Sequence, residues 1–189
     1  MKDTINTLGS ITSTRANAFD QAKGIVLFTA LIAVGAKIYI PHEPVPFTLQ
    51  TLFVVLTGAF LGWRNGMISV LTYLALGAAG VPVFAGPTAG PSILIGTTAG
   101  YLFGFVLAAG IVGAIMKANG SLLWTTLSMF IGFLIIFACG TFYLNVVFIH
   151  DWTITMTQGI MIFSYWDLIK LAAAIGIYRA YAVKSQHAN

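Results

Sequence analysis

The stretch GIVLFTALIAVGAKIYI, residues 24–40, decides the class of fold that this chain adopts. No charged residue interrupts it before Lys37. Together with residues 21–23 it has the roughly 20 residues that an α-helix, rising about 1.5 Å per residue, needs to cross a bilayer. The stretch therefore predicts a transmembrane helix over residues 21–40.

The composition of the whole chain has the same character. Of its 189 residues, 58% are hydrophobic and only 7% are charged, whereas soluble domains carry roughly 25% charged residues. Nine basic and five acidic side chains are too few to cover a globular surface in water, so most of the surface is expected to face lipid. The sequence predicts an all-α integral membrane protein.

Five further helices are expected from the later apolar runs. Arg64 with Gly62 and Gly66 predicts a tight polar turn between two short helices, and the glycine- and proline-rich segment 80–92 cannot be a regular helix. A polar segment, residues 1–20, precedes one membrane domain, residues 21–184. The six expected spans are residues 21–40, 48–62, 65–79, 93–117, 122–149 and 160–182.

The positions of the basic residues orient these spans. Cationic residues collect on the cytoplasmic side of membrane proteins, so the net charge of +4 reflects topology and not nucleic-acid binding. Both termini are expected to be cytoplasmic, with structured outer loops at residues 40–47, 80–92 and 150–160. Seven basic residues lie on the cytoplasmic side under this count: Lys2, Arg15, Lys23, Arg64, Lys117, Arg179 and Lys184.

Asp167 and Lys170 are the most informative polar residues. They lie three residues apart in the first turns of the last expected span, and so on one helix face. An ionisable residue within a span is costly and usually faces a cavity or a partner. The pair is either an ion pair that only stabilises the start of the helix or, as we expect, a contact for a ligand in an outer cavity.

The segment PVPFTLQ, residues 44–50, leads into the second span. Proline favours extended backbone before it and helix starts after it, so the segment can be read as the start of a helix with Thr48 as its cap. That reading leaves the amide of Gln50 unexplained. Gln50 and Thr48 are therefore candidates for contact with a ligand on the outer side.

Two further segments carry candidate binding residues. The segment GVPVFAGPTAGP, residues 80–91, is uncharged and non-helical, as expected of a pocket wall at membrane depth; the alternative is a surface connection. Phe84 is its apolar contact. The segment GTTAGY, residues 96–101, then places the hydroxyls of Thr97 and Tyr101 near the outer side.

Small residues follow one another along the first span. Either they pack inside the bundle, or they form a docking face for a second membrane protein, and the sequence does not separate the two. The residues are Thr29, Ala30, Ala33 and Ala36.

The sequence holds no recognisable catalytic or metal-binding pattern. Cys139 is the single cysteine, His42 and His150 lie in separate loops, and there is neither a Gly-x-Ser-x-Gly motif nor a phosphate-binding loop. We expect no catalytic residue, no metal and no cofactor. An intramembrane enzyme, another small-molecule channel and a structural membrane subunit are the alternative functions.

These motifs, in this order, resemble the BioY family, the biotin-binding S-components of energy-coupling factor (ECF) vitamin importers. The resemblance covers roughly residues 24–180. Its marks are PVPFTLQ at residues 44–50, GVPVFAG at 80–86, GTTAGY at 96–101, and Asp167 with Lys170.

The resemblance implies a six-helix membrane protein that binds biotin from outside a bacterial cell. It implies delivery through partners: an EcfT-like transmembrane coupling subunit and two EcfA-like cytoplasmic ATPases. Asp167 is expected to accept from a ureido N–H of biotin, Gln50 or a threonine to serve the other ureido atoms, and Lys170 to meet either Asp167 or the carboxylate. The remaining expected contacts are Phe84, Gly86, Tyr101 and Trp166.

Overall fold

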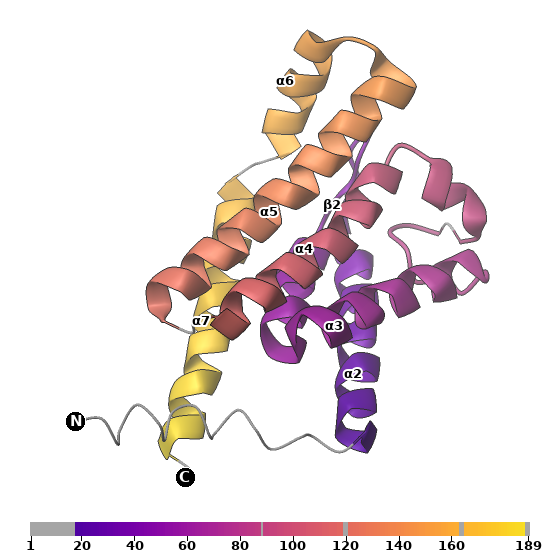
Figure 1. Cartoon of the computed structure of the whole chain (residues 1–189). Helices are drawn as coiled ribbons and strands as arrows, with labels where there is room; N and C mark the ends of the chain where they lie inside the picture. The colour runs from indigo at the N-terminus through magenta and orange to yellow at the C-terminus, as the bar shows by residue number, and fades with distance from the viewer. Residues whose placement is uncertain (1–17, 88, 119–120, 163–164, 188–189) are drawn as a thin grey trace.

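The computed structural model describes residues 18–87, 89–118, 121–162 and 165–187, and over these residues the chain is almost entirely helical (Figure 1). A two-stranded antiparallel hairpin follows the first helix. The elements are α2 (Ala18–Lys37), β1 (Tyr39–Ile40), β2 (Phe47–Thr48), α3 (Gln50–Ala78), a 3₁₀ turn (Pro91–Ile95), α4 (Ala99–Ala118), α5 (Leu122–Leu144), a π-helical turn (Asn145–Ile149), α6 (Trp152–Ile162) and α7 (Tyr165–His187).

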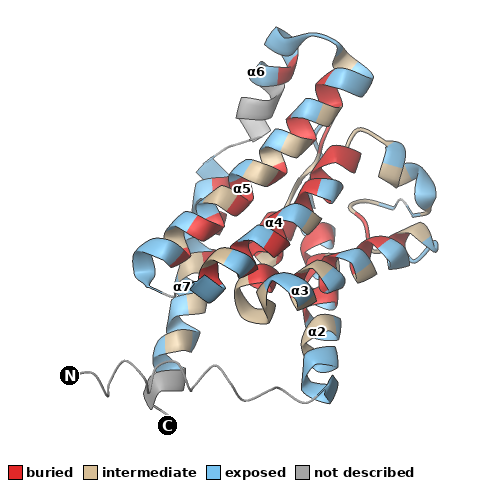
Figure 2. Cartoon of the chain, viewed as in Figure 1, coloured by how far each residue is buried: buried red, intermediate tan, exposed pale blue. Residues whose placement is uncertain are grey.

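Much of the described surface is apolar. Four helical stretches of the described residues are long and apolar enough to cross a membrane: α2, α3, α4 and Leu122–Ile149. Large apolar side chains such as Leu27, Phe103 and Leu134 are exposed along them. Figure 2 shows that buried residues gather where α3, α4 and α5 meet, while the outer faces of the helices are exposed. Such a surface suits lipid and not water, as the composition predicts.

α3 is a helical hairpin and not one straight helix. Gly62, near its middle, has φ 73° and ψ 177°, a conformation open to glycine because it has no Cβ. The Gln50 and Tyr73 side chains are 2.7 Å apart, although a straight helix would separate these residues by about 34 Å. The two halves therefore run antiparallel, as two short helices, but the turn lies at Gly62, whereas Arg64 and Gly66, which were expected in it, are helical.

Glycines allow α4 to approach its neighbours closely. A Cβ added to Gly100 would collide with Tyr143 of α5, and one added to Gly104 would lie 3.1 Å from Cys139. On its other side, α4 packs against α3, where a Cβ on Gly58 would collide with the carbonyl of Ala109. These contacts place α4 at the centre of the helix bundle, with α3 and α5 on either side.

Two predicted helix boundaries at the end of the bundle that holds the cavity are wrong. The first helix ends at Lys37 and not at residue 40, because Tyr39–Ile40 pairs with Phe47–Thr48 in the hairpin. The fourth helix begins at Ala99 and not at residue 93, because the preceding residues form a separate 3₁₀ turn that begins at a proline. Both corrections lengthen the irregular backbone beside the cavity described below.

The predicted limits at the two ends of the chain also need correction. Helix α2 begins at Ala18, so the end of the polar segment 1–20 is helical; its residues 1–17 lie outside the described part. At the other end, α7 runs from Tyr165 to His187 and so continues past residue 182, where the last span was expected to end; residues 163 and 164, between α6 and α7, lie outside the described part. In Figure 1 the start of α2 and the end of α7 lie at the same end of the molecule.

Candidate functional site

A cavity of about 340 Å³ lies at the other end of the bundle, where the loops between the helices meet. Its wall is formed by the 44–48 segment, the first turns of α3, α4 and α7, and the 84–85 and 92–98 segments. Cavities of this size are typical of small-molecule sites. Most of its lining is apolar, and its polar groups come mainly from β2, α3 and α7.

The charged groups of the lining are Asp167 and Lys170 of α7. Lys170 Nζ lies 2.5 Å from Asp167 Oδ1 and donates to the backbone carbonyl of Thr48 at 3.0 Å. Asp167 is 2% exposed and Lys170 8%, so neither charge is balanced by bulk water. Because the two charges compensate each other, the pair can stay ionised beside an apolar cavity.

A chain of hydrogen bonds continues from this pair along one wall. Thr48 Oγ1 accepts from the backbone N–H of Gln50 at 3.3 Å and donates to Gln50 Oε1 at 3.1 Å. Gln50 Nε2 then donates to the Tyr73 hydroxyl at 2.7 Å. Asp167, Lys170, Thr48, Gln50 and Tyr73, which we call the polar wall, thus form one connected network.

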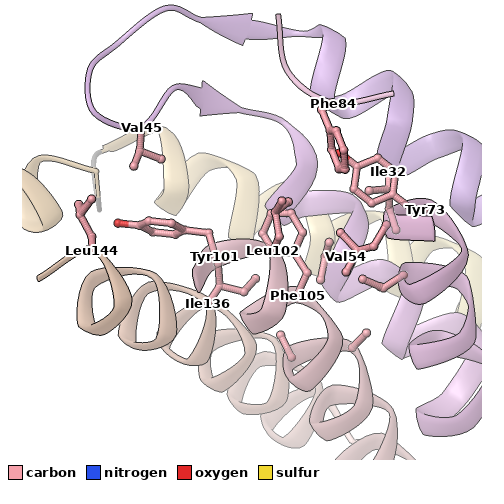
Figure 3. Packing of buried hydrophobic residues seen from close by; sticks show 14 residues of the cluster. Ile32, Val45, Val54, Tyr73, Phe84, Tyr101, Leu102, Phe105, Ile136 and Leu144 are labelled. Carbon is pink, nitrogen blue, oxygen red and sulfur yellow. The ribbon is translucent and has the colours of Figure 1, made fainter. Parts of the chain in front are cut away.

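Aromatic and aliphatic side chains form the other walls (Figure 3). Phe84 packs edge-on against the Tyr73 ring, with ring centroids 5.4 Å apart and an interplanar angle of 85°. Tyr101 packs in the same way against Phe137, with centroids 6.4 Å apart. Val45, from the loop between β1 and β2, lies over the Tyr101 ring in Figure 3. A flat apolar ligand would contact aromatic rings on several sides.

Two hydrogen bonds hold the outer loops in place over the cavity. Thr97 Oγ1 donates to the carbonyl of Pro44 at 2.9 Å, which ties the 41–46 loop to the segment before α4. Lys37 Nζ donates to the carbonyl of Gly86 at 2.9 Å, which ties the end of α2 to the 80–90 loop. Because the Thr97 proton is donated to Pro44, Thr97 can offer a ligand only its lone pairs.

The structure brings most of the predicted binding residues together. Seven of them line the cavity: Asp167, Lys170, Gln50, Thr48, Phe84, Tyr101 and Thr97. Gly86 is not in the lining; its carbonyl is the acceptor for Lys37, and its neighbour Ala85 lines the cavity instead. Trp166 is also outside the lining and is 60% exposed, because neighbouring residues of a helix point about 100° apart and Asp167 takes the inward direction.

Sequence reasoning missed four polar residues of the lining, Thr51, Tyr73, Ser92 and Thr98, of which Tyr73 belongs to the polar wall. Tyr73 is fully buried and lines the cavity, yet it lies in the second half of α3, far from any motif in the sequence. A signal exists, because Tyr73 places a hydroxyl in an apolar helix where leucine would pack as well. The apolar lining residues Phe105, Ile136 and Phe137 gave no such signal.

The small residues of α2 do not share one surface. Thr29 is buried, and its hydroxyl lies 3.0 Å from the backbone carbonyl of Ser69, to which it donates. Ala36 is fully buried as well. Ala33 is half-buried and packs against the core, and Ala30 is exposed. The burial of Thr29 and Ala36 agrees with the first of the two readings, packing inside the bundle.

The donor set of the site suits recognition of a polar organic group. The polar wall offers a carboxylate as acceptor and an ammonium, an amide and hydroxyls as donors, next to aromatic rings. Among the described residues, no group of three or more His, Cys, Asp or Glu side chains is placed to hold a metal ion. The arrangement fits a small ligand with a hydrogen-bonding head and an apolar body.

Comparisons with known proteins give a consistent result. The chain is 47% identical to the biotin transporter BioY of Thermotoga maritima over 148 residues, which cover 78% of this chain and 87% of that protein. It is 38% identical to the probable biotin transporter BioY of Pyrococcus horikoshii over 157 residues, which cover 80% of this chain and 89% of that protein.

The fold has a match among solved structures. It is similar to the crystal structure of the S-component for biotin from an ECF-type ABC transporter, with a TM-score of 0.80 and 22% identity, over 90% of this chain and 95% of that one. The profile of the BioY family matches residues 11–186. A transporter family and several apolar helices make this a multi-pass membrane protein and not an enzyme. The chain belongs to the BioY family.

Proposed function

We propose that this protein is the high-affinity biotin-binding subunit of an ECF-type vitamin importer, which captures biotin from outside the cell. The observation that carries the proposal is the buried Asp167–Lys170 pair, which lines a cavity of about 340 Å³. An ion pair that only stabilised α7 would need no cavity beside it. The relatives named above, which are biotin transporters, support the same ligand.

The chemistry of biotin matches the cavity. Its head is a neutral ureido group with two N–H donors and one carbonyl acceptor, fused to an apolar sulfur ring. Asp167 accepts from a ureido N–H, and Phe84 and Tyr101 cover the rings. A buried site of this kind rejects ligands that lack a hydrogen-bonding partner, because its own polar groups would then be left unpaired.

Isothermal titration calorimetry on the purified protein in detergent tests this function. One biotin per chain should bind, with a dissociation constant in the nanomolar range or below. Thiamine is a suitable control, since it is a vitamin of similar size that lacks the ureido group. If a preparation that unfolds cooperatively on heating, and is therefore folded, fails to bind biotin, the proposal is refuted.

The topology is proposed as six spans with both termini in the cytoplasm of a bacterial cell. The helical hairpin at Gly62 supports this count, because α3 then supplies two spans. Cysteine labelling tests it in a Cys139→Ala background in intact cells. An impermeant reagent should label Ala89→Cys from outside and should not label Asn189→Cys, a position outside the described residues; labelling of Asn189→Cys would refute the model.

Delivery of biotin to the cytoplasm is proposed to need partners. The sequence has no phosphate-binding loop, so a transmembrane coupling subunit and two ATPases would supply the energy. We place the docking surface on the exposed face of α2 around Ala30, next to Val26, Leu27 and Val34, which are all exposed. Of the four residues first considered, Ala30 and the half-buried Ala33 are retained.

A bulky substitution on this face should separate binding from transport. Ala30→Trp should keep biotin affinity within about twofold and abolish uptake in cells that also produce the coupling module, because the ring would hold the partner helix away. Leu107→Trp, on the exposed face of α4, is the matched control and should leave uptake intact. Normal uptake by Ala30→Trp would move the docking surface elsewhere.

A further inference from the structure

The far end of the polar wall holds a donor to which no role has yet been given. Tyr73 is fully buried, lines the cavity, and accepts a hydrogen bond from Gln50 Nε2 at 2.7 Å. Within the described part of the chain, that amide is the one hydrogen-bond partner found for the Tyr73 hydroxyl. The hydroxyl carries a proton of its own, which also needs an acceptor.

The direction of the hydrogen bonds decides where that proton points. Thr48 Oγ1 accepts from the backbone N–H of Gln50 and therefore donates its own proton to Gln50 Oε1. The Gln50 amide is thereby oriented, with its Nε2 directed at Tyr73. Because the amide donates to Tyr73, the Tyr73 proton cannot be directed back at it. Buried donors in proteins almost always have an acceptor, so the proton is available to a molecule in the cavity.

The surroundings of Tyr73 hold this donor still. Its ring packs edge-on against Phe84, and the two rings lie side by side in Figure 3. A Cβ added to Gly77, one turn further along α3, would collide with the same Phe84 ring. The ring can therefore neither swing nor slide without displacing Phe84. A rigid donor with a fixed direction selects for the position of the acceptor that it meets.

We propose that the Tyr73 hydroxyl donates to the ureido oxygen of biotin and so determines specificity for that oxygen. This inference rests on the proposed function and adds a residue to it. Asp167 and Tyr73 lie at opposite ends of the polar wall, one an acceptor and the other a donor. A ureido group presents N–H and C=O side by side and can be read by both ends at once.

Two other donors of the lining are engaged, whereas the buried hydroxyls of Thr51 and Tyr101 have no hydrogen-bond partner among the described residues. The Lys170 ammonium serves Asp167 and the Thr48 carbonyl, and the Thr97 proton is donated to Pro44. The hydroxyl of Tyr101 points toward Leu144 in Figure 3, away from Tyr73 and Phe84. Of these three hydroxyls, that of Tyr73 is the one held by the polar wall, through its hydrogen bond from Gln50.

The test compares biotin with 2-thiobiotin, in which sulfur, a weaker acceptor, replaces the ureido oxygen. Calorimetry measures both dissociation constants for the parent and for Tyr73→Phe. The variant should bind biotin about tenfold more weakly, and its preference for biotin over 2-thiobiotin should shrink by the same factor. The preference is a ratio measured on molecules that bind, so partial unfolding lowers the stoichiometry and leaves the ratio unchanged.

Two variants serve as controls. Tyr143→Phe removes a hydroxyl that donates to the carbonyl of Ile95 at 3.2 Å, outside the lining, and should leave both affinities unchanged. Tyr101→Phe removes the other tyrosine hydroxyl of the lining and should leave the preference unchanged. A preference that collapses in Tyr101→Phe instead of Tyr73→Phe would overturn the assignment.

The remaining outcomes separate the two proposals. A parent that binds biotin, with an unchanged preference in Tyr73→Phe, overturns this inference alone; the Tyr73 proton would then be directed at a reversed Gln50 amide. A parent that does not bind biotin overturns the proposed function and this inference together.

Discussion

Among the described residues, two of the clusters of buried polar side chains differ in what lies beside them. Between α2 and the second half of α3, the hydroxyls of Thr29 and Ser69 lie 3.1 Å apart, and both reach backbone carbonyls: Thr29 that of Ser69, and Ser69 that of Ile25. The polar wall, from Asp167 to Tyr73, has the cavity beside it.

The difference shows how to tell a structural polar group from a functional one inside a membrane protein. In the first cluster every hydroxyl proton has a backbone or side-chain acceptor, so the cluster holds two helices together. In the polar wall the network ends at a donor next to a cavity, so a ligand can complete it. Burial alone is the same in both clusters and does not separate them.

The largest effect is expected when the charge of Asp167 is removed, which tests whether the polar wall binds a ligand. Asp167→Asn should weaken biotin binding about ten- to hundredfold, because a hydrogen bond to a charged group contributes about 1.5–3 kcal/mol and Lys170 would be left buried without its counter-charge. Calorimetry measures the affinity. Asp151→Asn is the matched control, since Asp151 is exposed and accepts from the backbone of α6. If both variants bind biotin like the parent, the pair is structural.

Replacing Lys170 tests whether its ammonium group binds Asp167 or the carboxylate of biotin. Because Lys170 pairs with Asp167 and holds the Thr48 carbonyl, Lys170→Ala should weaken biotin and its methyl ester equally, by about tenfold or more. The ratio of the two affinities, compared with that of the parent, is the measurement. A loss for biotin that exceeds the loss for the ester by about tenfold would show that Lys170 meets the carboxylate of the ligand.

In contrast, a change in the Thr29–Ser69 cluster should lower stability and leave biotin binding almost unchanged. Thr29→Val removes a hydrogen bond between helices, which in membrane proteins contributes about 0.6 kcal/mol on average. The melting temperature in detergent should fall by roughly 1–2 °C, and biotin affinity should stay within about twofold of the parent. A variant that keeps its melting temperature and loses biotin affinity would show that the two clusters are coupled.

Some details of the fold were predictable because they depend on local chemistry. The Gly62 turn follows from a glycine beside Trp63 and Arg64 in an apolar run, since a polar turn at that point lets both helices stay in an apolar environment. The expected span over residues 122–149 likewise coincides with the helical stretch Leu122–Ile149.

The sequence by itself determined that the chain is a helical membrane protein, that it turns at Gly62, and that Asp167 and Lys170 share a helix face. These are consequences of composition and of short-range geometry, which every helix obeys. It also placed Thr48 and Gln50 in one turn, because they are two residues apart.

Only the tertiary structure decided which side chains meet in the cavity. Lys170 reaches Thr48 across 122 residues of sequence, and Gln50 reaches Tyr73 only because α3 folds back on itself. Sequence neighbours can differ in burial: Asp167 is buried and Trp166 is exposed, and Thr29 is buried and Ala30 is exposed. A periodic apolar helix offers several equivalent faces to lipid and to protein, and the packing of α3, α4 and α7 around one cavity selects among them.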